Sequence, residues 1–268
     1  MPGEQKHRRG FLSALATIGT GYATVGSAAA SSSVCARKSA DDSKAVQQNQ
    51  VGPVDESVPQ MTERHSHIQG PTALIVGGIH GDERAGIVAA HEISEWNPDY
   101  GRIIVIPEAN PQAIEQNTRV NDRGDLNRKF IYNRKPTSAL SQSIWSAVKK
   151  LSPDVLFTLQ ESRGIMGSTP SGVGQMVFHA PSKSARDGAT MGVRRANAQI
   201  GSQRLKFGMD TISGPAVKPN GLLSEKATYE ANIPSFIVET YENLDMGARV
   251  QFQTTITRGI LDYFDIFE

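Results

Sequence analysis

Residues 74–86 read Leu74-Ile-Val-Gly-Gly-Ile-His80-Gly-Asp-Glu83-Arg-Ala-Gly86. The apolar run that opens this stretch contains β-branched residues, which predicts a short strand covered on both faces. The glycine pair after it allows a sharp turn, and a helix is expected to begin soon afterwards. Because residues three apart lie on one side of a helical turn, His80 and Glu83 are expected to face each other. An imidazole and a carboxylate held together are suitable zinc ligands, although an acidic helix start beside an incidental histidine would give the same pattern.

The composition excludes several classes of protein. A formal net charge of +1 over 268 residues gives no indication of binding to nucleic acid or to an anionic membrane surface. A single cysteine excludes a disulfide framework and a zinc site built from thiolates. Any metal site must therefore use nitrogen and oxygen ligands, and the chain has six histidines that could supply the nitrogen.

The first thirty residues resemble an export signal. Arg8 and Arg9 precede Phe11 and Leu12, and an apolar run rich in small residues continues to Ala30. A charged start, an apolar middle and a small-residue end are typical of a secretory signal, and the paired arginines are similar to a twin-arginine signal. We therefore predict that residues 1–30 direct export from the cytoplasm. A disordered tail or a weak membrane anchor is the alternative, and the many small residues argue against a permanent span.

Residues 31–70 are polar and show no hydrophobic period, so they predict a flexible linker. His65 and His67 stand near its end and could lie on one side of a strand, but a solvated segment is the favoured interpretation.

Residues 71–268 alternate between strand and helix patterns, which predicts one three-layer α/β domain. We expect a mostly parallel mixed sheet with helices on both faces. On the first helix, Ala85, Val88, Ala89 and Ile93 are expected to face the core. The expected strands are residues 73–76, 102–106, 155–159, 175–179 and 235–239, and the expected helices are residues 82–94, 138–150, 184–200, 222–231 and 246–264.

Polar side chains follow several of these strands. Such folds gather their sites at the carboxyl ends of the strands, where His80, Gln160, His179 and Glu239 are expected. Glu239 follows four apolar residues, so burial should raise its pKa towards the range of a general base. The alternative for Glu239 is an ion pair with a nearby arginine.

The loop after the second strand carries Arg119 and the run Asp125-Leu-Asn127-Arg128. A guanidinium group can bind a carboxylate through two hydrogen bonds, and Asn127 beside it can donate a third. A surface loop built from Asx turns would also explain this composition.

Taken together, these motifs resemble the zinc carboxypeptidase-like superfamily, and within it the succinylglutamate desuccinylase/aspartoacylase group. The resemblance rests on Gly-Gly-Ile-His80-Gly-Asp-Glu83, Asn110-Pro111-x-Ala113, Arg119, Asp125-Leu-Asn127-Arg128 and Ile237-Val-Glu239, which occur in the family's order. It implies a zinc carboxypeptidase-like catalytic domain over residues 71–268.

The resemblance also implies roles for single residues. His80 and Glu83 would bind one zinc ion, and Arg119 would polarise the scissile carbonyl. Asn127 and Arg128 would bind a substrate carboxylate, and Glu239 would carry protons. The implied reaction is hydrolysis of an amide beside a carboxylate, in an N-acyl amino acid or at the C-terminus of a peptide.

Gln160 departs from the family pattern, which has a histidine as third zinc ligand at this place. Three interpretations stay open. In the first, Gln160 binds the metal through its amide oxygen. In the second, His179 substitutes for the histidine. In the third, metal binding and catalysis have weakened. The last would leave a protein that binds carboxylate ligands without turnover.

Overall fold

The computed structural model describes residues 59–268 except 168–171 and 219. The predicted signal at residues 1–30 and most of the predicted linker at residues 31–70 lie outside the described residues. No helix in the described ranges is long and apolar enough to cross a membrane.

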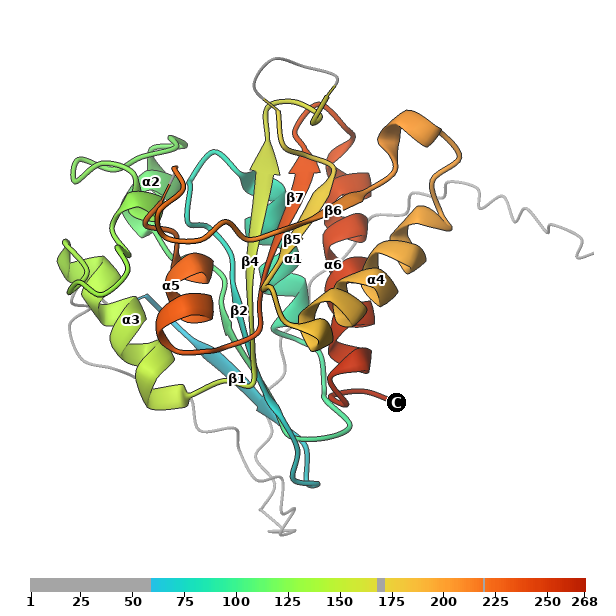
Figure 1. The fold of residues 1–268 in the computed structure, drawn as a ribbon, viewed down its shortest axis with the longest axis horizontal. Coiled ribbons are helices and arrows are strands. Elements are labelled where there is room, and N and C mark those ends of the chain that lie inside the picture. The colour runs from blue at the N-terminus through green and yellow to red at the C-terminus, as the bar shows by residue number, and fades with distance from the viewer. Residues whose placement is uncertain (1–58, 168–171, 219) are drawn as a thin grey trace, which may run out of the picture. The chain divides into compact units, whose positions relative to one another are not determined.

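The described part of the chain folds around one seven-stranded sheet with the order β1-β3-β2-β4-β7-β5-β6 (Figure 1). Strands β3, β2, β4 and β7 run parallel, whereas β1 is antiparallel to β3, and β5 is antiparallel to β7 and parallel to β6. The sheet is therefore mixed and mostly parallel, as predicted. The strands are β1 (Thr62–His65), β2 (Thr72–Val76), β3 (Arg102–Ile106), β4 (Val155–Ser162), β5 (Met176–His179), β6 (Gly208–Thr211) and β7 (Ser235–Tyr241).

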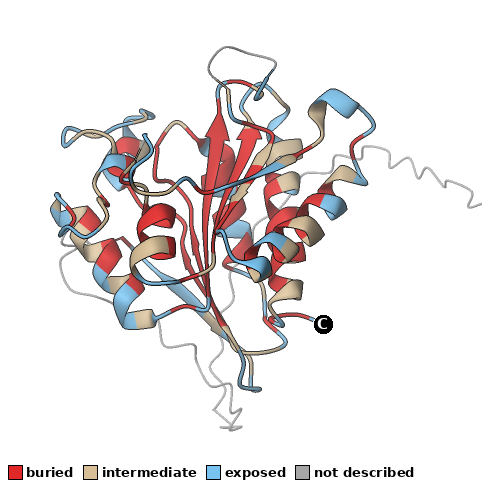
Figure 2. Cartoon of the chain, in the orientation of Figure 1, coloured by how far each residue is buried: buried red, intermediate tan, exposed pale blue. Residues whose placement is uncertain are grey.

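Helices cover both faces of this sheet (Figure 1). One apolar cluster joins the sheet to α1 (Arg84–Ile93), α4 (Lys183–Asn197) and α6 (Met246–Tyr263). A second cluster joins its other face to α3 (Ala139–Leu151) and α5 (Leu223–Glu230). The central strands are buried between these layers (Figure 2), which confirms the predicted three-layer α/β fold. The remaining elements are the short α2 (Pro111–Glu115) and the 3-10 turns η1 (Leu126–Arg128) and η2 (Gln203–Leu205).

Two edge strands were not predicted. Strand β1 lies within the stretch interpreted as a flexible linker, so residues 62–65 are paired in the sheet. Strand β6 lies where a loop was expected. Each has four residues and most of their side chains are exposed, so neither carries the apolar alternation by which a strand is recognised.

Helix α1 begins at Arg84, later than expected, because Glu83 has the non-helical angles φ −91° and ψ 68°. His80 and Glu83 therefore meet across a turn and not along a helical turn. The expectation for Val88 was wrong, since its side chain is 43% exposed while Ala85, Ala89 and Ile93 are buried.

The direction of β5 rules out His179 as a replacement metal ligand. His179 pairs with Phe236 at the start of β7, whereas Met176 pairs with Glu239. The carboxyl end of β5 thus lies at the opposite edge of the sheet from the carboxyl ends of β2, β4 and β7. His179 is buried there, and its Nδ1 lies 2.8 Å from the carbonyl oxygen of Ala180.

Candidate active site

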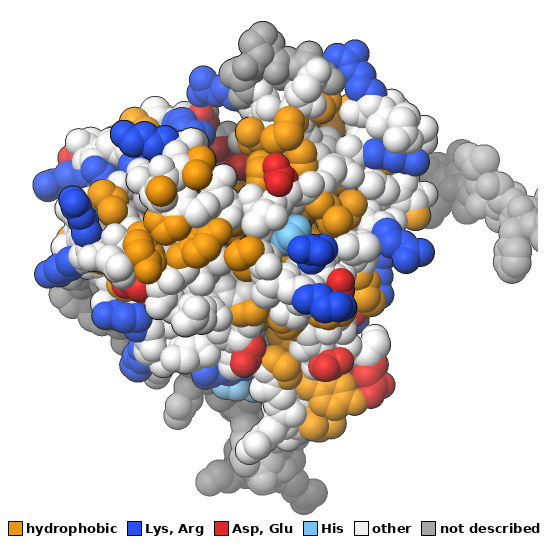
Figure 3. Space-filling model, viewed as in Figure 1, with side chains coloured by type: hydrophobic (Ala, Val, Ile, Leu, Met, Phe, Trp, Pro, Cys, Tyr) orange, Lys and Arg blue, Asp and Glu red, His pale blue; other side chains and the backbone are white. Residues whose placement is uncertain are grey.

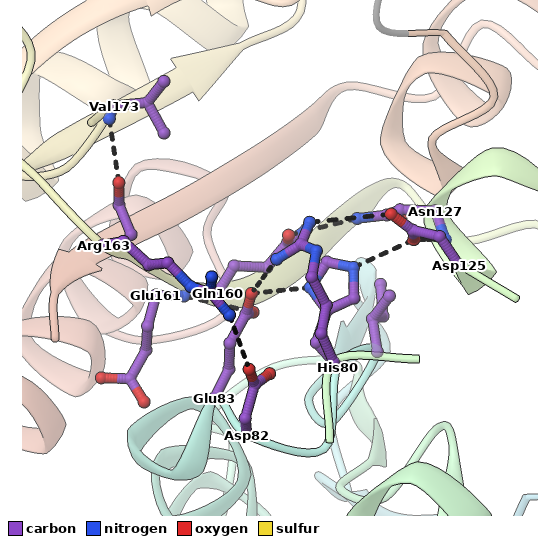
Figure 4. Close-up of polar contacts among 12 residues, drawn as sticks. His80, Asp82, Glu83, Asp125, Asn127, Gln160, Glu161, Arg163 and Val173 are labelled. Carbon is purple, nitrogen blue, oxygen red and sulfur yellow. Dashed lines mark hydrogen bonds and ion pairs between the residues drawn. The ribbon is translucent and has the colours of Figure 1, made fainter. Parts of the chain in front are cut away.

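His80 is fully buried at the carboxyl end of β2 and contacts two carboxylates (Figure 4). Its Nδ1 lies 2.6 Å from Oε1 of Glu83, and its Nε2 lies 3.1 Å from Oδ1 of Asp125. Histidines that bind metals commonly have a carboxylate on the ring nitrogen that does not face the metal. Asp125 contacts Nε2, so it would occupy that position if Nδ1 bound a metal beside the Glu83 oxygen.

These contacts change the protonation of the pair. Burial alone would lower the pKa of His80, but the hydrogen bonds with Asp125 and Glu83 outweigh it and raise that pKa to about 9. Burial would likewise raise the pKa of Asp125, yet its hydrogen bond with His80 lowers it to about 2. Without a metal, His80 is therefore an imidazolium between two carboxylates at neutral pH.

The turn that carries His80 is held by the Asn110 motif. A Cβ added to Gly81 would lie 1.9 Å from the carbonyl oxygen of Ala113, so only glycine permits this approach. Asn110 donates from Nδ2 to the carbonyl oxygen of Ile79 at 3.3 Å, and its Oδ1 accepts from the backbone N–H of Ala113. The two motifs are therefore one structural unit, in which α2 fixes the turn before Glu83.

Two arginines contact the carboxylates around His80. Arg119 lies 3.1 Å from Oε1 of Glu83 through Nη1 and 3.8 Å from Oδ2 of Asp125 through Nη2. Arg128 lies 3.9 Å from the same Asp125 oxygen and donates to the carbonyl oxygen of Asn127 at 2.7 Å. Both arginine side chains are 41% exposed, so each keeps N–H groups that could donate to a substrate carboxylate or oxyanion.

Gln160 lies within β4 and reaches the same loop. Its Oε1 accepts a 3.1 Å hydrogen bond from Nδ2 of Asn127, and its Nε2 donates to Oγ1 of Thr158 at 3.2 Å. Asp125 contacts His80 and Asn127 contacts Gln160, so one short turn connects both ends of the site. The amide oxygen keeps a second lone pair, and it is the third metal ligand available on this side.

Glu239 stands directly across from Gln160 in the pairing of β4 with β7. Its side chain is buried, and its Oε2 has no hydrogen-bond partner among the described residues. Burial, followed by the charge of Glu83, raises the pKa of Glu239 to about 8. No arginine within the described ranges forms an ion pair with it, so the structure does not support the alternative of an ion pair, and the role of Glu239 as a base stays a prediction.

Sequence reasoning missed three contributors to the site. Asp125 was visible inside a quoted motif, but nothing local indicated its contact with His80. Glu161 follows Gln160 and accepts a 2.8 Å hydrogen bond from the backbone N–H of Ala85. Its partner Arg249 comes from α6, and no signal in the sequence links that helix to the site.

In Figure 3 a hollow opens beside the carboxyl end of β4, with acidic side chains at its bottom and lysine or arginine side chains near its rim.

The donors fit a metal ion in part. His80 Nδ1 and Oε1 of Glu83 lie 2.6 Å apart, and the amide oxygen of Gln160, which accepts a hydrogen bond from Asn127, is the further oxygen that a metal ion could use. Within the described ranges, no group of three or more His, Cys, Asp or Glu side chains could hold a metal ion. A metal site here would need an amide oxygen where a histidine would be the usual ligand.

Residues 69–158 match the Succinylglutamate desuccinylase/Aspartoacylase catalytic domain. This match confirms the predicted resemblance over that segment of the chain. The matched segment includes His80, Glu83, Arg119, Asn127 and Arg128. It ends at Thr158, before Gln160 and Glu239.

One curated relative shares sequence with part of the chain. The N-alpha-acetyl-L-2,4-diaminobutyric acid deacetylase of Halomonas elongata is 42% identical over 67 residues, which cover 23% of this chain and 20% of that protein.

Solved structures share the fold. A product-bound cell shape determinant protein from Helicobacter pylori has a TM-score of 0.70 at 20% identity. The match covers 78% of this chain and 55% of that protein's chain. The same protein, described as a D,L-carboxypeptidase, has been solved with mDAP bound. A metallo-carboxypeptidase from Burkholderia cenocepacia has a TM-score of 0.57 at 14% identity and covers 76% of this chain and 60% of its own. The chain spans little more than half of these structures, and the likeness shows the fold alone.

Proposed function

We propose that this protein is a zinc-dependent hydrolase that cleaves an amide bond in a carboxylate-bearing substrate. The observation that carries the proposal is the His80–Glu83 pair, which Asp125 contacts from behind, together with the buried Glu239, whose Oε2 has no hydrogen-bond partner among the described residues. The family is one of hydrolases, and deacetylase and carboxypeptidase relatives support the reaction class.

The proposed ligands are His80, Glu83 and Gln160. When bound, zinc would supply Lewis acidity that polarises a carbonyl group and lowers the pKa of water. Glu239 would accept a proton from the attacking water and return it to the leaving amine, for which a pKa near the working pH is favourable. Arg119 would donate to the developing oxyanion. Asn127 and Arg128 would hold the substrate carboxylate.

The substrate test compares the two reactions that the relatives represent. Purified protein with zinc should hydrolyse either N-acetyl amino acids or short peptides with a free C-terminal carboxylate. The same compounds with an amidated C-terminus are the matched control, because they remove the carboxylate that Arg128 would bind. Equal rates on free and amidated compounds would contradict the proposed carboxylate site.

A second candidate follows from Gln160. A weak metal site would leave a protein that binds carboxylates through Asn127 and Arg128 without turnover. That candidate predicts thermal stabilisation by N-acetyl amino acids with no hydrolysis at any zinc concentration. Glu239→Gln should leave this stabilisation by the ligand unchanged.

Replacing Gln160 by histidine tests the third ligand. Imidazole binds zinc better than a neutral amide oxygen, so Gln160→His is expected to tighten zinc binding about tenfold or more and to raise kcat. Calorimetric titration and elemental analysis would measure this. Gln112→His, which adds an exposed histidine on α2, is the control for adventitious zinc. Unchanged affinity in Gln160→His would show that residue 160 is not a ligand.

The charge of His80 predicts that metal binding depends on pH. Because its metal-free pKa is about 9, a metal must displace a proton below that pH. Apparent zinc affinity should therefore rise with pH towards 9, by roughly tenfold per unit for one released proton. Calorimetry in buffers of different ionisation enthalpy would count the protons. Asp125→Asn removes the contact that raises this pKa most, so its affinity should vary less with pH. A flat affinity between about pH 6 and 9 in the wild-type protein would contradict the assigned charge.

Export stays a prediction from Arg8, Arg9 and the apolar run after them. Cell fractionation of the full chain beside a double Arg→Lys variant at these positions would test it.

A further inference from the structure

Residue 161 contacts the proposed metal ligand Glu83 from behind the site. The backbone N–H of Glu161 donates to Oε2 of Glu83 at 3.2 Å. Oε1 of Glu83 is the atom near His80 and Arg119. One carboxylate oxygen is thus held by β4, which leaves the other directed at His80.

The side chain of Glu161 makes a second contact close to Glu83, at the start of α1. Successive residues of a strand point to opposite faces, so Glu161 points away from Gln160 and towards α1 and α6 (Figure 4). Its Oε2 accepts from the backbone N–H of Ala85 at 2.8 Å. Ala85 lies in the first turn of α1, where free N–H groups favour a carboxylate. Residue 161 therefore holds both the carboxylate of Glu83 and the helix start that follows it.

Helix α6 supplies the groups that hold residue 161. Arg249 forms an ion pair with Oε1 of Glu161, and the two side chains are only 13% and 3% exposed. One turn later, Gln253 donates from Nε2 to the carbonyl oxygen of Gln160 at 3.0 Å and to Oγ1 of Thr240. The last helix of the chain thus binds two consecutive residues of β4 that flank the site.

Arg249 also balances a concentration of negative charge. Glu83 and Glu161 are both buried and lie in the same region. Removing one partner of a buried ion pair leaves a charge without compensation, and that charge would lie one residue from Gln160 and in contact with α1.

We propose that Arg249, acting through Glu161, is a positioning residue that fixes Glu83 for metal binding. This inference rests on the proposed function and extends it to a residue that contacts neither metal nor substrate. It assigns α6 the task of holding the ligand Glu83 in place.

A double-mutant cycle read out by zinc affinity tests the proposal. Arg249→Met keeps the length of the side chain and removes its charge, and we expect zinc binding to weaken about 10- to 100-fold. Arg249→Lys keeps the charge and should retain most of the affinity. The double variant Arg249→Met with Glu161→Gln removes the unpaired charge and keeps an oxygen for Ala85, so it should bind zinc more tightly than Arg249→Met alone.

The control is Arg258→Met on the same helix, which removes an ion pair with Asp262 and a contact with the Phe267 ring. It should lower Tm and leave zinc affinity unchanged. If Arg249 had a merely structural role, Arg249→Met would behave in the same way and would lower Tm without weakening zinc binding. Wild-type affinity in Arg249→Met, or an equal loss in Arg258→Met, would overturn the inference while the proposed function stands. A wild-type protein that binds no zinc would overturn both.

Discussion

Glu239→Gln is expected to lower kcat about 10²- to 10⁴-fold, the contribution of a positioned general base. The amide has the shape of the carboxylate but cannot accept a proton. Glu239 is not among the proposed ligands, so zinc content should stay at the wild-type level. Steady-state kinetics together with elemental analysis would separate these effects. Activity that survives the substitution would show that Glu239 is not the base.

The same variant carries an internal check on folding. The pKa of Glu239 is raised from 4.5 to about 8 in the metal-free folded state, so the native protein keeps this proton where the unfolded chain has lost it. Stability from this group therefore falls as pH rises between those two values. Below about pH 4.5, Glu239→Gln should have the same free energy of unfolding as the wild-type protein. Above about pH 8, the free energy of unfolding of Glu239→Gln should exceed that of the wild-type protein by an amount on the order of a few kcal/mol. Denaturant unfolding of metal-free protein at both ends of the range would measure this.

His80→Ala is expected to remove zinc and to reduce hydrolysis to background. It deletes the only nitrogen ligand proposed, and the remaining carboxylate and amide oxygens are poor zinc ligands by themselves. It also leaves Glu83 and Asp125 without the imidazolium between them. Loss of one partner from a buried charged pair costs about 3–5 kcal/mol, so Tm should also fall.

His179→Ala is the matched control, because it removes a histidine that is equally buried but lies at the opposite edge of the sheet. Zinc content should survive in that variant whatever the change in Tm. Retention of zinc by His80→Ala, or its loss from His179→Ala, would contradict the assigned site.

The parts of the fold that sequence reasoning predicted are those with strong local signals. Strand β2 reads as a continuous apolar run because both of its faces are covered. Glu239 follows the apolar residues of β7, and burial of its carboxyl group follows from that position. The edge strands β1 and β6 lack such signals, since a strand that is exposed and paired on one side needs no apolar side chains.

The candidate site divides in the same way. His80 and Glu83 lie three residues apart, so their proximity could be predicted even though the helix begins only after them. The contact of His80 with Asp125 joins residues 45 positions apart, and the contact of Glu161 with Arg249 joins residues 88 positions apart. Contacts at such separations depend on how the elements pack, which no local pattern records.

By itself, the sequence determined the fold class, the proximity of His80 and Glu83, the arginine loop and a buried carboxyl group within β7, because each depends on neighbours along the chain. Only the tertiary structure decided the direction of β5, which removes His179 from the site, and the place of Asp125 behind His80. It also decided that α6 reaches residue 161. Strand direction and helix docking are settled by the burial of surfaces distant in sequence, and so the support of the site follows from the fold as a whole.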